Sequence, residues 1–165
     1  MQVNESNQDQ IELLKQLLSD TPGFSGENRL FTAWAAVFAL GSEQVQVLIE
    51  ENVDKPDDTQ LKSIKYAVHR MGVTNPYFIA RTYVEVQSGG TLNALGFRPL
   101  QELGVTNETA YHCACVAVSL INGGFMCLRS HVESLQQSGA SDELIDAVMR
   151  LAAVCHSLRS AAYGG

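Results

Sequence analysis

Long apolar runs and clusters of basic residues are both missing from this chain of 165 residues. No run approaches the ~18 apolar residues of a membrane-spanning helix, so we expect no membrane span. Lysine and arginine number only 11 and are spread thinly, and the formal net charge is −7. This charge argues against nucleic acid and anionic membranes as partners. Residues 1–10 are polar and lack the basic-then-apolar order of a secretory signal, so we expect a cytoplasmic protein with reduced cysteines.

The chain also lacks the strict alternation of polar and apolar residues that marks β-strands. Apolar residues instead recur at helical spacing, and the 45% hydrophobic content is ordinary for a globular domain. We therefore predict an all-α fold in one domain, residues 1–165, with a loose lead-in at 1–7. The predicted helices cover residues 8–18, 29–40, 61–71, 107–121, 125–138 and about 141–162. A further helix is predicted after Ser42, with apolar positions between residues 45 and 49, and another is opened by Thr74-Asn75-Pro76 and reaches about residue 86. Gly72 is expected to end the helix at 61–71, and residues 91–105 form the longest irregular segment.

The clearest chemical signal lies in residues 121–133, which join two predicted helices through Asn-Gly-Gly. Cys127 and His131 are four residues apart, so they share one face of a helix. A thiol beside an imidazole, close to the start of a helix, is a setting that favours the thiolate. The pair is therefore a candidate nucleophile and base.

A weak internal repeat relates residues 74–85 to residues 122–133 without a gap, and Arg, Val and Glu coincide in the two copies. The repeat predicts a duplicated helix-turn-helix unit. Ile79 and Tyr83 stand where the second copy has Cys127 and His131. The chemistry therefore belongs to the second copy.

These residues resemble the AhpD-type alkylhydroperoxidases of the carboxymuconolactone decarboxylase-like family. The resemblance rests on residues 117–123, on Cys127, Leu128, His131 and Glu133, and on Ser138-Gly139 with the final helix. The front half is similar only at the level of pattern. In this family a Cys-x-x-Cys motif, a histidine separated from its second cysteine by three residues, and a glutamate on the preceding helix reduce organic hydroperoxides.

The resemblance implies several further properties. Electrons come from a lipoyl-bearing protein, and partner peroxiredoxins are reduced by the same route. The family fold is all-helical, and its members are often homo-oligomers, commonly trimers. No bound cofactor is implied, and the sequence carries no flavin, nucleotide or haem motif. The His and Cys spacing matches no standard zinc pattern, so no metal ligands are predicted.

The chain departs from the family pattern at three positions. Gly124 replaces the first motif cysteine, Met126 replaces a histidine, and His112 stands at the place of the relay glutamate. Only Cys127 and His131 carry over directly. The candidate catalytic residues are therefore Cys127, His131 and His112. For His112 the alternative, that it is only a helix-surface or interface residue, is equally open.

Without a cysteine at position 124, the local dithiol cycle cannot close. A sulfenic acid on Cys127 would then need an external thiol, or Cys115 as a substitute resolving thiol. Three hypotheses follow: an AhpD-like peroxidase acting through Cys127, a family member without turnover that acts as a binding or regulatory protein, and a lyase like carboxymuconolactone decarboxylase. The lyase would use His112 and His131 for proton transfer.

Overall fold

The computed structural model describes residues 5–19 and 21–161, which form seven α-helices and no strand. The helices are α1 (Gln8–Ser19), α2 (Gly26–Leu40), α3 (Glu43–Glu50), α4 (Asp58–Tyr83), α5 (Glu108–Asn122), α6 (Phe125–Gln137) and α7 (Asp142–Leu158). Two short 3-10 helices, η1 (Asn93–Leu95) and η2 (Leu100–Glu102), lie between α4 and α5. The all-α prediction is confirmed. Residues 1–4 of the predicted lead-in and residue 162 of the predicted last helix lie outside the described residues.

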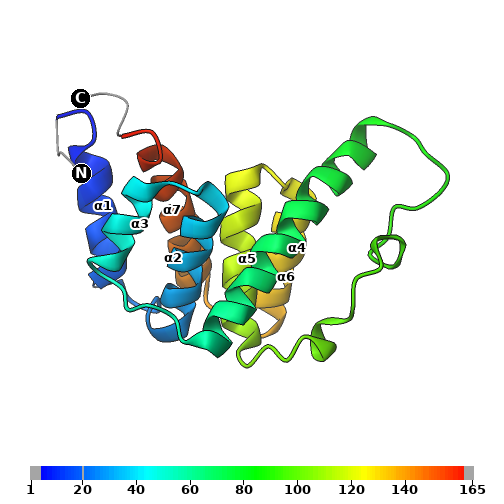
Figure 1. Ribbon diagram of the computed structural model, residues 1–165, viewed down its shortest axis with the longest axis horizontal. Coiled ribbons are helices and arrows are strands. Elements are labelled where there is room, and N and C mark those ends of the chain that lie inside the picture. The colour runs from blue at the N-terminus through cyan, green and yellow to red at the C-terminus, as the bar shows by residue number, and fades with distance from the viewer. Residues whose placement is uncertain (1–4, 20, 162–165) are drawn as a thin grey trace.

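Helix α5 is the centre of the fold. It contacts α2, α4, α6 and α7, and Figure 1 shows it between the α1–α3 and α7 group on one side and α4 with α6 on the other. Nine of its 15 residues are buried, including Cys113, Cys115 and Ser119. A helix that is apolar on every side is stable only when it is covered on every side, which this position provides.

Helix starts follow local capping signals that the sequence displays. The side chains of Ser42, Asp57, Asn107 and Ser141 each accept a hydrogen bond from the backbone N–H three residues later. These bonds satisfy N–H groups that have no partner inside the helix. The starts predicted after Ser42 and at residues 141–143 are confirmed, and α4 begins at Asp58, three residues before the predicted start at residue 61.

The predicted break between residues 71 and 74 is wrong, because α4 runs without interruption from Asp58 to Tyr83 with Pro76 inside it. Proline cannot donate the backbone hydrogen bond to the carbonyl of Gly72. Both residues are exposed, so that carbonyl is open to water. The neighbouring Asn75 is buried and bonded to α5, which holds the helix through the proline. The first copy of the repeat therefore lies within one helix, while the second copy joins α5 to α6.

The connection from residue 84 to residue 107 leaves the end of α4 and returns along its side (Figure 1). Arg81 donates hydrogen bonds to the carbonyls of Val86 (2.6 Å) and Ser88 (2.8 Å), and the Tyr77 hydroxyl accepts one from the N–H of Gly90 (2.7 Å). These bonds fix the connection against α4. Apart from its two 3-10 turns it is irregular, as predicted. Within the described part of the chain, no helix combines the length and apolarity needed to cross a bilayer.

Candidate active site

A cavity of about 600 Å³ lies between α4, α5, α6 and the connection after α4. This volume is within the ~300–1,000 Å³ typical of sites for small organic ligands. Its walls are largely apolar, formed in part by Met71, Phe78, Leu92, Phe97, Leu100 and Met126. All three candidate catalytic residues of the sequence, Cys127, His131 and His112, line it.

Cys127 and His131 lie one turn apart at the start of α6. The chain enters this helix through Gly123, whose φ of 69° is the left-handed conformation that glycine adopts without strain. The predicted sharp turn is therefore present. Cys127 is 8% exposed, so its sulfur reaches outside reagents through the cavity that it lines.

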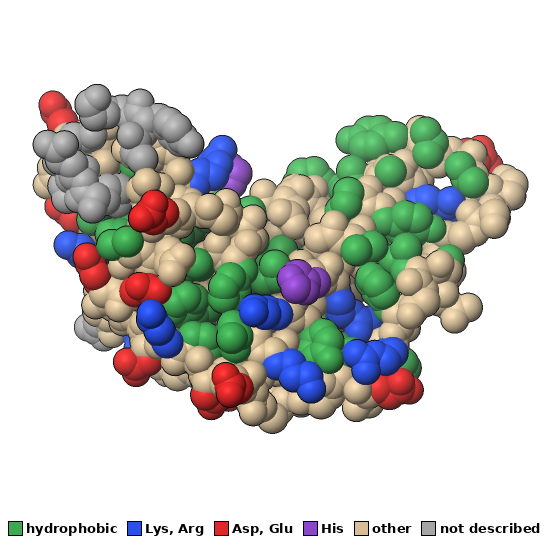
Figure 2. Space-filling view, in the orientation of Figure 1, with side chains coloured by type: hydrophobic (Ala, Val, Ile, Leu, Met, Phe, Trp, Pro, Cys, Tyr) green, Lys and Arg blue, Asp and Glu red, His purple; other side chains and the backbone are tan. Residues whose placement is uncertain are grey.

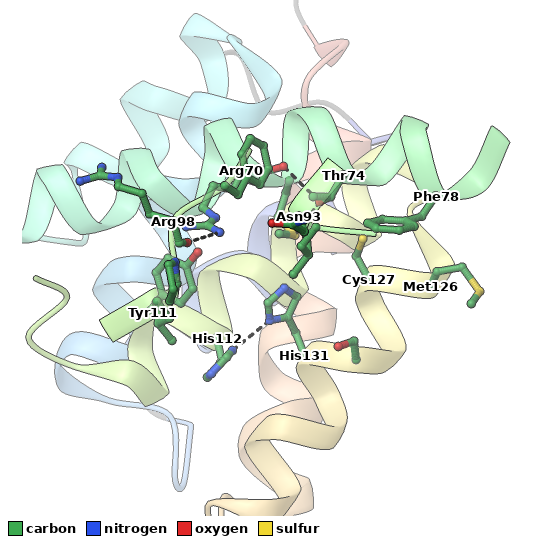
Figure 3. Close-up of a pocket in the computed structure, with 16 residues that line it drawn as sticks. Arg70, Thr74, Phe78, Asn93, Arg98, Tyr111, His112, Met126, Cys127 and His131 are labelled. Carbon is green, nitrogen blue, oxygen red and sulfur yellow. Dashed lines mark hydrogen bonds between the residues drawn. The ribbon is translucent and has the colours of Figure 1, made fainter. Parts of the chain in front are cut away.

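His112 of α5 and His131 of α6 face each other, with their Nδ1 atoms 2.9 Å apart (Figure 3). At this distance one imidazole donates a proton on Nδ1 and the other accepts it, so at least one ring is the Nδ1–H form and the other keeps an Nδ1 lone pair. The structure thus brings together two histidines that are 19 residues apart in the sequence. In Figure 3 the ring of His131 lies between His112 and Cys127.

Both imidazoles are held in the neutral form at pH 7. Burial is the main cause that lowers the pKa of His131, to about 4; repulsion from His112 when that ring is protonated, and from the Arg70 guanidinium, lowers it further. Burial also lowers the pKa of His112, although Glu108 acts in the opposite direction. A neutral His131 has a lone pair available for a proton, as a general base requires.

The other three cysteines are buried in the core. Burial raises the pKa of Cys113 and of Cys155 to about 12 each and raises that of Cys115 as well. All three therefore stay protonated at neutral pH and pack as small apolar side chains. Cys155 lies in the core of α7, and Cys115, whose raised pKa leaves almost no thiolate at neutral pH, is a slow nucleophile toward a sulfenic acid.

A hydrogen-bonded cluster lies where α4 meets the turn between α5 and α6. Asn75 donates to Ser119 Oγ (3.0 Å), accepts from Asn122 (3.0 Å), and is 1% exposed. A Cβ added to Gly124 would overlap the Asn75 amide and lie 2.7 Å from its Cβ. The Asn75 side chain therefore fills the space that any side chain at position 124 would need.

Sequence reasoning missed Arg70 and Arg98, which line the cavity, and also Asn75. For Arg98 the length of the irregular connection was the available signal, because loops longer than ~12–15 residues are commonly functional. Arg70 and Asn75 lie inside α4, where no such signal exists. Among the residues described, no group of three or more His, Cys, Asp or Glu side chains is arranged to hold a metal ion.

Comparison with known proteins finds similarity along most of the chain. The sequence model of the carboxymuconolactone decarboxylase family matches residues 103–163, which contain α5, α6 and α7. A protein named alkyl hydroperoxide reductase AhpD from Caulobacter vibrioides is 33% identical over 144 residues, which cover 84% of this chain and 76% of that protein. A protein of the same name from Coxiella burnetii is 30% identical over 149 residues, covering 88% and 84%. A third, from Hyphomonas neptunium, is 32% identical over 125 residues, covering 74% and 69%.

The chain is all-helical in its described residues, and two proteins named alkyl hydroperoxide reductase AhpD are at least 30% identical to it over more than four fifths of its length. The protein belongs to the carboxymuconolactone decarboxylase family, among its AhpD-like members.

Proposed function

We propose that this protein is an AhpD-like antioxidant enzyme that reduces organic hydroperoxides through Cys127. The observation that carries the proposal is the placement of Cys127 with a neutral His131–His112 pair on the wall of one largely apolar cavity. The similarity to proteins named alkyl hydroperoxide reductase supports the reaction class.

In the proposed reaction, His131 accepts the thiol proton of Cys127, and the sulfur attacks the terminal oxygen of the hydroperoxide ROOH. The O–O bond breaks, an S–OH bond forms, and sulfur supplies the two electrons. The proton returns from His131 to the departing alkoxide, which gives ROH. His112 holds the His131 ring through the Nδ1 contact and fixes which nitrogen carries the proton.

The resulting sulfenic acid is resolved by a thiol from outside the chain. Gly124 supplies no sulfur, and Asn75 occupies the space beside it. A first thiol R′SH condenses with Cys127–SOH to give Cys127–S–SR′ and water, and a second thiol then releases Cys127–SH and R′S–SR′. A dithiol of the lipoyl type supplies both sulfurs in one molecule. We therefore propose a lipoyl-bearing protein or another thiol as the electron donor.

The remaining partners follow the family. We propose a cytoplasmic homo-oligomer, with a peroxiredoxin as a further partner that receives electrons through the same thiol. No bound metal or organic cofactor enters the scheme.

Intact-protein mass spectrometry after addition of stoichiometric cumene hydroperoxide tests the proposal. Wild type is expected to gain one oxygen rapidly, and Cys127→Ser is expected to lose that gain. His131→Gln should slow it by about 10²-fold or more, the usual contribution of a positioned acid or base. The exposed His69, which does not line the cavity, provides the matched control His69→Gln.

Two other outcomes have definite meanings. Loss of two hydrogens instead of a gain of oxygen would show a substitute disulfide, with Cys115 as its first candidate. If wild type stays unmodified over minutes, the peroxidase proposal fails and a binding or regulatory protein without turnover takes its place.

The contact between two neutral imidazoles also supports a second candidate, a cofactor-free lyase in which His112 and His131 transfer protons. This activity needs no thiol, so it would survive Cys127→Ser and disappear in His131→Gln. Turnover of a carboxymuconolactone by Cys127→Ser would favour it over the peroxidase.

A further inference from the structure

The cavity carries positive charge in a chain that is acidic as a whole. Its lining includes Arg70 and Arg98 and no aspartate or glutamate, although the chain has 18 acidic and 11 basic residues. Figure 2 shows lysine and arginine side chains interspersed with hydrophobic ones over the lower end of α4 and the connection after it. Lys62 and Arg98 both lie near the Tyr66 ring in this region. An anionic ligand is therefore attracted to this face.

Arg70 is held in a fixed position without a carboxylate partner. Its Nη2 donates to the carbonyl of Arg98 (2.9 Å), and its guanidinium lies 4.9 Å from the centre of the Phe97 ring. Among the described residues, neither Arg70 nor Arg98 has an acidic group within 4.0 Å. A half-buried guanidinium that is stacked and oriented in this way keeps further N–H groups free for a planar, two-oxygen acceptor.

The other residues of the cavity indicate the chemistry of the rest of the ligand, beyond the anionic group on Arg70. In Figure 3 Arg70, Arg98 and Tyr111 lie toward one end, Cys127, Phe78 and Met126 toward the other, and Asn93 and His131 between them. A ligand that spans the cavity thus has an anionic group at one end, a hydrocarbon body, and its other end near the thiol.

We infer that the cavity binds free carboxylic acids with an apolar chain, with the carboxylate on Arg70, and that the hydroperoxides reduced are those of such acids. The second half of this inference rests on the proposed peroxidase function; the first half does not. A carboxylate matches the guanidinium in shape and charge, and the apolar walls suit an alkyl chain. Arg98 adds positive charge at the same end.

Binding of octanoate, measured by calorimetry, tests the site without any reaction. Wild type should bind octanoate at least tenfold more tightly than octanamide, which has the same chain and no charge. Arg70→Gln should remove this preference by weakening octanoate tenfold or more while leaving octanamide unchanged. The exposed Arg129 on α6, outside the cavity, provides the control Arg129→Gln, which should bind as wild type does.

The comparison of octanoate with octanamide on wild type tests the inference even if Arg70→Gln fails to fold. Arg98→Gln changes an exposed side chain at the same end of the cavity, and it should reduce the preference for octanoate as well. Equal affinities for octanoate and octanamide would overturn the inference. So would an undiminished preference for octanoate in Arg70→Gln.

A comparison of two hydroperoxides, one with a free carboxylate and one with a methyl ester, distinguishes failure of this inference from failure of the proposed function. The rate of oxygen gain on Cys127 should be at least tenfold higher with linoleic acid hydroperoxide than with its methyl ester. Equal rates would overturn the substrate class and leave the peroxidase standing. If neither compound oxidises Cys127 while octanoate still binds more tightly than octanamide, the proposed peroxidase function is wrong and the carboxylate site remains supported.

Discussion

His131 takes up a proton less readily in the folded protein than an imidazole in water does, mainly because it is buried beside a second imidazole and near Arg70. The ordinary pKa of histidine is ~6.5, and the folded value is about 4. Between pH 4 and pH 6.5, His131 is therefore protonated in the unfolded chain and neutral in the folded chain. The free energy of unfolding therefore falls as the pH decreases from 6.5 to 4, by up to roughly 3 kcal/mol for this group alone.

We expect the His131 ring to remain neutral at pH 5.5, which imidazole ¹⁵N shifts in an NMR titration would show directly. In urea unfolding between pH 7 and pH 4.5, His131→Gln should lose less stability than wild type does. His69→Gln, at an exposed site, should retain the wild-type pH dependence. If the free energy of unfolding of His131→Gln falls with decreasing pH as steeply as that of wild type, the pH dependence does not arise from His131.

At the scale of elements, the turn between α5 and α6 is fitted closely against α4. Gly124 immediately precedes α6, where the Asn75 side chain of α4 forms hydrogen bonds with Ser119 and Asn122. A side chain at position 124 and asparagine at position 75 cannot occupy the same space. The lack of a second active-site thiol is therefore built into the packing of three helices.

Gly124→Cys alone should destabilise the protein by about 1–3 kcal/mol, the usual cost of overpacking a core. Adding Asn75→Gly should recover part of this loss, because it vacates the space that the new side chain needs. Urea unfolding measures both effects, with Asn75→Gly alone as the control. Titration of free thiols after mild oxidation should show a disulfide between positions 124 and 127 in the double variant.

If Gly124→Cys is as stable as wild type, Asn75 has moved aside at little cost. The close fit between α4 and this turn would then not be the reason for glycine.

Local sequence signals predicted most helix boundaries and failed at α4. Ser42 and Asp57 cap helices through bonds to residues three positions away, so the signal and its effect are both local. Gly72 and Pro76 are ordinary end and start signals, and here they lie inside one helix. What overrides them is the burial of Asn75 against α5, a contact across 44 residues that no local pattern contains.

The same distinction holds for the site. The spacing of Cys127 and His131 is visible in one turn of helix, and the family resemblance pointed to His112. Arg70 joins them only because α4 packs beside α5 and α6 and because the connection places Phe97 and the Arg98 carbonyl against its guanidinium. Sequence patterns carry no information on which side chains these long-range contacts bring to one cavity.

The molecule as a whole exposes several large apolar side chains, two of which, Leu92 and Met126, line the cavity. Tyr83 is 81% exposed, Phe125 67% and Met126 49%, and Val84 and Leu92 are exposed too. They come from the end of α4, the connection after it and the start of α6. Exposed apolar groups of this kind commonly mark contacts between proteins.

We predict that this surface mediates self-association, as expected from the family's oligomers. Sedimentation velocity should show a species larger than 18.0 kDa for wild type. Phe125→Glu should shift it toward the monomer. Val47→Glu changes an apolar residue on α3 that is 39% exposed, and it should leave the assembly intact. A monomeric wild type would contradict the prediction.

The placement of Cys127 on the wall of one cavity has a consequence for the order of events in turnover. In the proposed peroxidase cycle, hydroperoxide and reducing thiol must both reach the same 8%-exposed sulfur, and the cavity that it lines has a volume of about 600 Å³. The alcohol has to leave before the thiol enters, so the two half-reactions alternate on a modified enzyme. Double-reciprocal plots at several thiol concentrations would then be parallel, and an excess of either reactant would inhibit the half-reaction of the other.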